Sequence, residues 1–189
     1  HHVATFGGEI VRITPRLAFE APGGDAELTG VYFADAGQYI ENRLLVDHAV
    51  PNCRSNVLYK GALQGDKASK LPEARTCWVG DVLIRAEAKG TDTYETNRNL
   101  VLTDGARADA IPNLEIETGE IAGAGHAATV GRFDDDQLFY LRSRGIREED
   151  ATRLIIRGFF NEVLNQIPVE SIREELIARV AGELERNEN

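Results

Sequence analysis

The chain of 189 residues contains no methionine, one tryptophan and only two cysteines, Cys53 and Cys77. Two cysteines without a C-x-x-C spacing cannot form the disulfide framework of a small secreted domain, and nothing in the pattern supports a single bridge between them. No apolar run approaches the roughly 20 residues that a membrane-spanning helix requires, and no charged-then-apolar leader opens the chain. These absences favour a reduced, cytoplasmic protein.

Positive charge is also scarce, because 21 lysine and arginine residues face 31 aspartate and glutamate residues, giving a formal net charge of −10. A nucleic-acid surface needs a basic footprint, and an anionic membrane attracts basic segments, so neither partner is expected. The chain does contain 42% apolar and 28% charged residues, a composition typical of a soluble globular protein with one good core.

Residues 3–130 read as short apolar segments broken by Gly, Pro and Asp turns, a pattern that predicts β-strands. The segments begin roughly 12 to 20 residues apart, which we interpret as one coil of a solenoid per segment rather than a hairpin. Asn42, Asn56 and Asn97 lie inside such segments, where their side chains are expected to line up along the stack. A β-sandwich is the alternative on pattern alone.

At Asp134 the period of the apolar residues changes from strand-like to helix-like. Asp134 is expected to cap a helix that ends at Gly145. Two further helices are predicted, at about 148–167 and 169–186, on either side of Pro168. The sequence therefore predicts a β domain over residues 1–132 and a small α-helical subdomain over residues 133–189.

Four blocks in this order resemble the C-terminal half of SufD, within the SufB/SufD family of the SUF iron–sulfur cluster assembly machinery: Asn97-Arg98-Asn99-Leu100, Pro112-Asn113-Leu114-Glu115-Ile116, His126-Ala127-Ala128-Thr129-Val130-Gly131 and Leu138 to Ile146. SufB-like chains carry a Glu after the His and a Phe-Tyr-Cys element, whereas this chain has Ala127 and Leu141. Many relatives also have a Cys where this chain has Ala124, which excludes a thiolate at that position. The resemblance is therefore to SufD.

That resemblance implies a fold and a role. The fold is a mainly β, right-handed parallel β-helix followed by the small C-terminal α-helical subdomain, as the C-terminal fragment of a longer chain whose N-terminal region is absent here. The role is a non-catalytic scaffold that pairs with SufB through its β-helix and binds the SufC ATPase through its C-terminal helices. No tightly bound cofactor is implied, only transient iron or a nascent iron–sulfur cluster at the SufB interface. Without SufB, the chain is expected to form a homodimer.

His126 is the first candidate site residue. Gly123, Gly125 and Ala128 around it satisfy the dinucleotide pattern G-x-G-x-x-A, but no long helix follows, so that interpretation fails. The resemblance aligns His126 with a histidine near the SufB–SufD interface, where a neutral imidazole could bind iron. The alternative is a histidine bonded to a backbone carbonyl beside a tight turn.

The other candidates are a second cluster and the helical faces. His48 and Cys53 form a weak metal pair, because two ligands do not close a site, and a buried structural thiol is the alternative for Cys53. The helices offer apolar faces that either pack internally or dock the ATPase. The predicted partner interface consists of His126, Phe159, Phe160, Leu176 and Ile177.

A different class of function remains open, a carbohydrate-active or carbohydrate-binding β-solenoid. Glu115 and Glu117 alternate with Leu114 and Ile116, as on the solvent face of a strand, and acidic pairs on such faces serve carbohydrate-active enzymes. The chain shows no catalytic triad or H-E-x-x-H pattern, and aromatic residues are only 7% of the sequence. We therefore expect no enzyme activity.

Overall fold

The computed structural model describes residues 1–66, 68 and 70–185. Strands occupy the N-terminal two thirds of this part and helices the remainder. The elements are β1 (His2–Phe6), β2 (Ile10–Ile13), β3 (Arg16–Phe19), β4 (Asp25–Ala34), β5 (Tyr39–His48), β6 (Arg54–Leu63), β7 (Ala74–Ile84), β8 (Asp92–Val101), β9 (Ala106–Ile116), β10 (Gly123–Arg132), α1 (Asp135–Ser143), α2 (Glu148–Leu164) and α3 (Glu170–Glu185).

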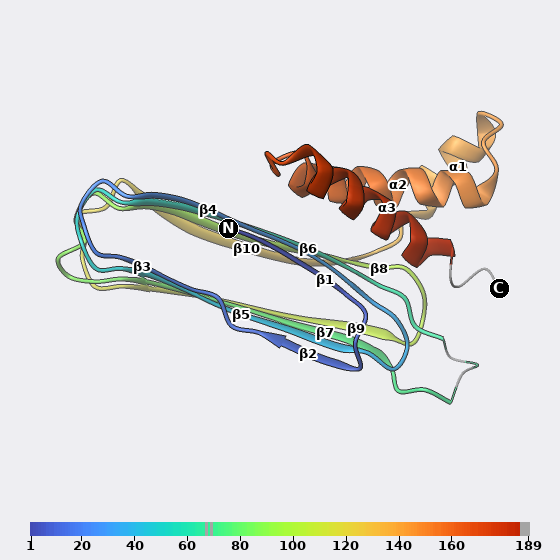
Figure 1. The fold of residues 1–189 in the computed structure, drawn as a ribbon, viewed down its shortest axis with the longest axis horizontal. Coiled ribbons are helices and arrows are strands. Elements are labelled where there is room, and N and C mark those ends of the chain that lie inside the picture. The colour runs from blue at the N-terminus through green and yellow to red at the C-terminus, as the bar shows by residue number, and fades with distance from the viewer. Residues whose placement is uncertain (67, 69, 186–189) are drawn as a thin grey trace.

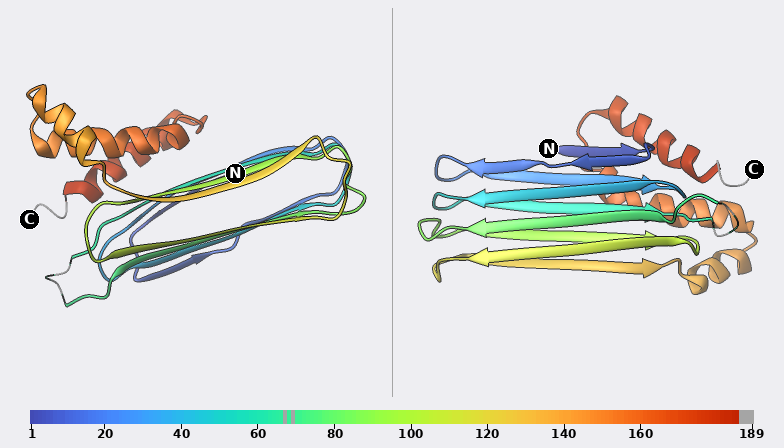
Figure 2. Two further views of the ribbon diagram at one scale, coloured as in Figure 1. Left: turned by 180° about the vertical axis from the view of Figure 1, so that it is seen from behind. Right: turned by 90° about the horizontal axis from the view of Figure 1, so that it is seen from below.

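The strands form two sheets that lie face to face (Figure 1). The first sheet has the order β1-β4-β6-β8-β10, and the second has the order β2-β5-β7-β9, with β3 also paired to β5. From β4 onward, successive strands alternate between the sheets, and the described pairs are parallel. Figure 2 shows the strands of the second sheet running side by side in chain order. The mainly β class with parallel sheets and C-terminal helices is confirmed, and an antiparallel Greek-key sandwich is excluded.

The register corrects the expected repeat length. Asp25 on β4 pairs with Arg54 on β6, 29 positions later, and Ser55 on β6 pairs with Thr93 on β8, 38 positions later. One repeat therefore contains two strands, one in each sheet. The prediction that each segment makes a whole coil was wrong, because from β4 onward the chain changes sheet at every turn.

The inward-facing side chains of the two sheets make the main core. Its largest members include Trp78, Tyr32 and Tyr59, all fully buried. The asparagine ladder that the sequence predicted does not form among the described residues. Asn42 lies beside Trp78, while Asn56 faces outward and donates to Glu27 at 2.9 Å. The register places each asparagine next to a different residue type, so none can stack on another.

The start of the first helix follows the expected pattern. Asp134 accepts hydrogen bonds from the backbone N–H groups of Asp136, at 2.9 Å, and Gln137, at 3.3 Å. After α1, Gly145 has a φ of +85°, a left-handed conformation that glycine adopts without a steric cost. The change from strand to helix thus occurs where the sequence predicted it.

The helices pack on the outer face of the first sheet, near one end of its strands (Figure 1). Phe160 and Ile156 of α2 join Phe33 of β4 in a second buried cluster. Lys60 of β6 is buried beneath α2 and donates to the carbonyl oxygen of Phe159 at 2.8 Å. Its ammonium also lies 4.6 Å from the centre of the Phe159 ring. The helices and the first sheet therefore share a hydrophobic core.

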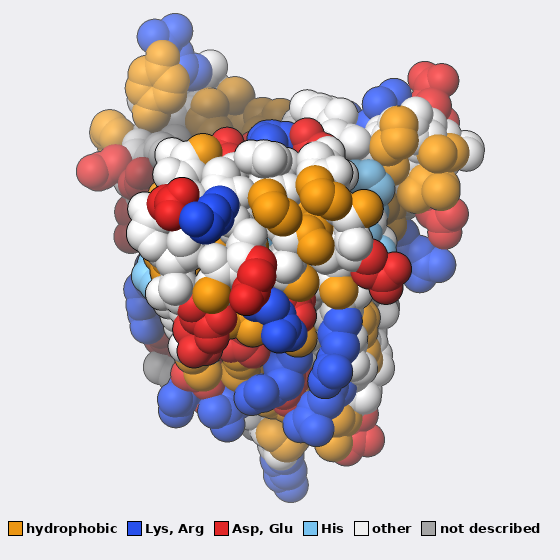
Figure 3. All heavy atoms as spheres, turned by 90° about the vertical axis from the view of Figure 1, so that its left-hand side faces the viewer, with side chains coloured by type: hydrophobic (Ala, Val, Ile, Leu, Met, Phe, Trp, Pro, Cys, Tyr) orange, Lys and Arg blue, Asp and Glu red, His pale blue; other side chains and the backbone are white. Residues whose placement is uncertain are grey.

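The surface carries charges of both signs. At the end of the sheets seen in Figure 3, acidic and basic side chains are interspersed. Pairs such as Asp47 with Arg85, at 2.8 Å, and Glu120 with Lys89, at 2.7 Å, join neighbouring repeats. None of the helices that the structure describes is long and apolar enough to span a bilayer.

Candidate functional site

The strands β9 and β10 are edge strands, and no further strand in the described part of the chain covers the core beyond them; we call this side of the stack the open end. Each is the last strand in its sheet. Ile116 of β9 pairs with Ile84 of β7, yet Ile116 is 44% exposed and Ile84 is 0% exposed. Likewise Val130 of β10 is 51% exposed, whereas its partner Asn99 of β8 is 3% exposed. Inward-facing residues at this end are therefore more exposed to solvent than the residues with which they pair in the preceding strands.

A cleft of about 530 Å³ lies at this open end. The small side chains of Ala108, Ala110 and Ala128 leave space for this cleft. Asp109 lies at its edge, where burial opposes ionisation but hydrogen bonds from Arg75 and Arg107 lower its pKa. Burial also raises the pKa of the Cys77 thiol, so this cysteine is a poor nucleophile. The cleft is lined by Arg75, Cys77, Arg107, Ala108, Asp109, Ala110, Ile111, Ala128 and Val130.

His126 lies at the boundary between the open end and the core. It pairs in register with Glu95 of β8, and its Nδ1 atom is 3.9 Å from Glu95 Oε1. The His126 side chain is 43% exposed, whereas the Glu95 side chain is fully buried. Burial raises the pKa of Glu95 to about 8, and repulsion from Asp81 adds to the effect. Neither Glu95 oxygen has a hydrogen-bond partner among the described residues.

The glycines before His126 form no turn. Gly123 to Gly125 begin β10, so His126 lies within a strand. The dinucleotide-binding interpretation fails as expected, because a strand and not a helix follows the glycines. The alternative of a histidine beside a tight turn was wrong, because the glycines allow close strand packing instead: a side chain at Gly125 would collide with the ring of Tyr94.

His48 and Cys53 lie in the closed part of the core. His48 Nε2 is 2.9 Å from Ser55 Oγ, which is 2.7 Å from Thr93 Oγ1, and burial lowers the pKa of His48 to about 4. Cys53 Sγ instead lies 3.6 Å from the carbonyl oxygens of Ala21 and Pro51. No three metal-binding side chains come together in the part of the chain that the structure describes. The geometry therefore gives no support to a His48–Cys53 metal pair.

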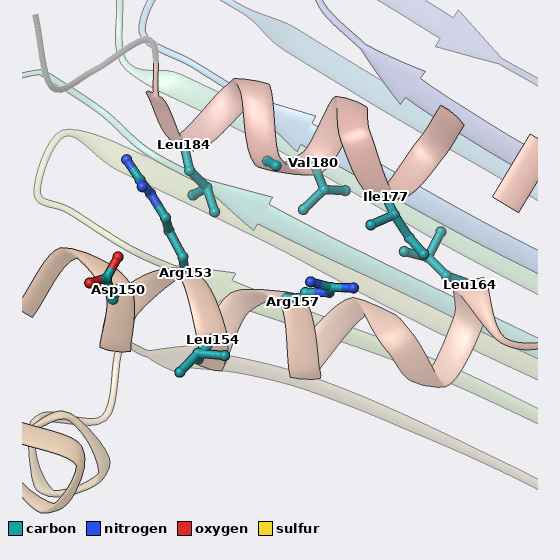
Figure 4. A pocket seen from close by; sticks show the side chains of 9 residues that line it. Asp150, Arg153, Leu154, Arg157, Leu164, Ile177, Val180 and Leu184 are labelled. Carbon is teal, nitrogen blue, oxygen red and sulfur yellow. The ribbon is translucent and has the colours of Figure 1, made fainter. Parts of the chain in front are cut away.

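A second candidate surface is a groove of about 320 Å³ between α2 and α3 (Figure 4). Leu164 and Val180 form a buried floor, while Leu154 at its rim is 51% exposed. Figure 4 shows side chains of α3 pointing toward α2 and Arg153 reaching across the groove. The lining residues are Asp150, Arg153, Leu154, Arg157, Leu164, Ile177, Val180, Ala181 and Leu184.

The structure separates the apolar residues predicted for this surface. Ile177 lines the groove, and Leu176 is partly buried. Phe160 is fully buried, and Phe159 packs edge-on against it with the ring centres 5.2 Å apart. Phe160 therefore has no free surface for a partner in this conformation. Leu154 belongs to the apolar face that the sequence predicts for this helix, but it was not among the predicted interface residues, because its position on the helix gives no signal that α3 leaves it uncovered.

Comparison with known proteins gives consistent matches. The model of the family described as "SUF system FeS cluster assembly, SufBD core domain" matches residues 1–159. An iron–sulfur cluster assembly SufBD family protein of Mycobacterium tuberculosis is 66% identical over 189 residues, which are 100% of this chain and 48% of that protein. Iron–sulfur cluster assembly protein SufD of Escherichia coli is 30% identical over 183 residues, 97% of this chain and 41% of that protein.

SufD of Bacillus subtilis is 44% identical over 95 residues, 50% of this chain and 22% of that protein. The chain thus spans about half of the length, or less, of these curated relatives. Neither the family description nor these names mention carbohydrate, so the carbohydrate interpretation gains no support.

Proposed function

The chain belongs to the SufBD core domain family of the SUF iron–sulfur cluster assembly system, and from this premise we propose that it is a non-catalytic scaffold of the SufD type in the cytoplasm. The observation that carries the proposal is the uncovered end of the two sheets, where inward-facing residues such as Val130 are exposed. A strand edge of this kind is a template for pairing with another chain. The scaffold acts by holding partners together there.

The first proposed partner is SufB, which pairs with β9 and β10. We further propose that the two sheets form one right-handed parallel β-helix, as the alternation of strands between sheets and the usual hand of parallel connections favour. A homologous β-helix in SufB would then continue the open end. In its absence a second copy of this chain takes the same place, giving a two-fold homodimer.

Iron is the proposed cargo at this interface. His126 is the exposed metal-binding side chain of β10, and imidazole suits iron. One histidine does not close a metal site, so the remaining ligands come from the partner. The site therefore holds iron or a nascent cluster transiently, as cargo and not as a resident cofactor.

The second proposed partner is the SufC ATPase, bound at the groove between α2 and α3. The groove is mainly apolar, with Leu154 and Ile177 accessible and Arg157 at the rim. Apolar surface next to charge is the usual composition of a protein interface. Because α2 shares its core with the first sheet, the helices present SufC at a fixed position relative to the scaffold.

Co-purification of the chain with SufB and SufC from its own organism tests both surfaces. Val130→Glu should abolish SufB capture, because it introduces a charge into the pairing surface. Ile10→Glu, at an exposed apolar position on β2, is the control and should leave capture unchanged. Leu154→Glu should abolish SufC capture, with Val169→Glu as its control. Full capture of both partners by Val130→Glu and Leu154→Glu would contradict the proposed surfaces.

A further inference from the structure

Glu95 is a buried acid without a hydrogen-bond partner among the described residues. Both of its carboxyl oxygens lie out of contact with solvent. On the same face of the first sheet, its register neighbour on β6 is Val57, which can offer no hydrogen bond from its side chain. Burying a carboxyl group is unfavourable unless it is hydrogen-bonded. A partner for Glu95 is therefore expected on its remaining side.

The surroundings of Glu95 direct one oxygen toward His126. A side chain at Gly80, on the facing sheet, would collide with Glu95 Oε2 and with the ring of Trp78. Gly80 thus provides the space that the carboxyl group occupies, and Oε2 lies against the backbone of Gly80. The other oxygen, Oε1, lies 3.9 Å from His126 Nδ1. His126 is the side chain placed to satisfy it.

We propose that Glu95 is a positioning residue for His126, accepting a hydrogen bond from its Nδ1–H group and leaving the Nε2 lone pair directed away from the core. An N–H···O hydrogen bond has an N–O distance of about 2.7–3.2 Å, so the two atoms must approach by roughly 1 Å. The His126 ring can make this movement because it is 43% exposed on the last strand, whereas Glu95 is enclosed. Nε2 is then the atom offered to whatever covers the open end.

The arrangement matches a general feature of histidine chemistry. A histidine that binds a metal ion usually donates its other ring N–H to a carboxylate or carbonyl group, which fixes the tautomer and the ring orientation. Glu95 supplies this support from inside the core, where no partner protein can displace it. The identity of the metal and of the covering partner rests on the proposed function, but the tautomer of His126 does not.

Nitrogen NMR of the full chain, labelled at histidine, tests the inference directly. At pH 9 carboxyl groups are ionised and imidazoles neutral, so the ring nitrogen shifts report which nitrogen carries the proton. A hydrogen bond to a charged acceptor should favour the Nδ1–H form of His126 by about tenfold. In Glu95→Leu the ratio should fall below one, and in Glu95→Gln, which keeps a neutral acceptor, it should be intermediate.

His48 provides a reference within the same spectrum. Its resonances should stay unchanged in each variant if the core is intact, and Glu115→Gln, on the exposed face of β9, should leave His126 unchanged. A wild-type His126 that is mainly in the Nε2–H form would overturn the inference, even if Glu95→Leu failed to fold. An unchanged ratio in a folded Glu95→Leu would overturn it as well. Because the isolated chain is used, a failure to capture SufB would contradict the proposed function without affecting this result.

Discussion

Two histidines face the interior of the same fold and end in opposite environments. His48 lies between Phe19 and Ile84 in its row across the second sheet, is fully buried, and bonds to Ser55. His126 has Glu95 on one side in its row across the first sheet and is 43% exposed. The orientation of the side chain is the same. What differs is whether another strand follows, so the open end is a consequence of position in the stack and not of residue type.

The largest difference in stability should come from placing a charge in the closed core and, separately, at the open end. Ile84→Asp buries an unpaired carboxylate in the closed core and should cost more than about 4 kcal/mol, enough to prevent folding. Ile116→Asp, at its register partner on the open end, should cost less than about 1 kcal/mol when measured on the monomer, at protein concentrations too low for the proposed homodimer to form. Urea unfolding monitored by circular dichroism measures both. Equal losses in the two variants would show that the open end is closed in solution.

The sequence could predict which segments are strands but not how they share the core. The strand segments of β4 and β8 and the cap at Asp134 are local signals, and these predictions were confirmed. The length of a repeat is not local, because it depends on which distant strand each segment pairs with. One coil was therefore assigned to every strand segment, whereas each repeat consists of two strands.

The candidate site was also only partly predictable. His126 could be chosen because the family resemblance includes it. Glu95 could not, because in the run Tyr94-Glu95-Thr96 alternation favours an inward tyrosine and an outward glutamate, and the structure has the opposite. Register with Val57 places Glu95 inside, and only the space at Gly80 on the facing sheet makes that position tolerable.

Removing each histidine should give the next largest difference. His48→Ala removes a buried ring that packs on Phe19, with ring centres 4.7 Å apart, and leaves Ser55 with only its hydrogen bond to Thr93, which should cost about 2–3 kcal/mol. His126→Ala should change the free energy of unfolding by less than about 0.5 kcal/mol. Thermal or chemical denaturation of the two variants checks this. A large loss for His126→Ala would mean that His126 belongs to the core.

Two of the buried titratable groups, His48 and Glu95, should give opposite pH dependences. The folded pKa of His48 is about 4 against an ordinary value of 6.5, so its contribution to stability is present above pH 6.5 and is lost as pH falls toward 4. The folded pKa of Glu95 is about 8 against an ordinary value of 4.5, so stability should fall as pH rises from 4.5 to 8. Each change should amount to a few kcal/mol, at about 1.4 kcal/mol per unit of pKa difference.

Variants separate these two contributions. Between pH 4.5 and 8 the wild type should lose unfolding free energy relative to Glu95→Gln. Above pH 8 the difference between the two proteins should become constant. The same difference for His48→Gln should change only between pH 4 and 6.5. Unfolding in urea at a series of pH values supplies both curves. A Glu95→Gln curve parallel to that of the wild type would show that Glu95 ionises freely in the folded chain.

The smallest effect is expected where the chain has no buried side chain to lose. None of the residues of α1 is buried, so this helix contributes little to either core. Asp134→Ala removes the side-chain cap of α1 and should weaken the helix by about 1 kcal/mol. Because α1 can fray without exposing the core, hydrogen exchange should accelerate several-fold in residues 135–143 while global unfolding stays within about 0.5 kcal/mol of the wild type. Asp135→Ala, in the first turn but without the capping bonds, is the matched control. A global loss as large as the local one would mean that α1 folds cooperatively with the sheets. The cooperatively folded unit would then extend to Ser143 and would not end at β10.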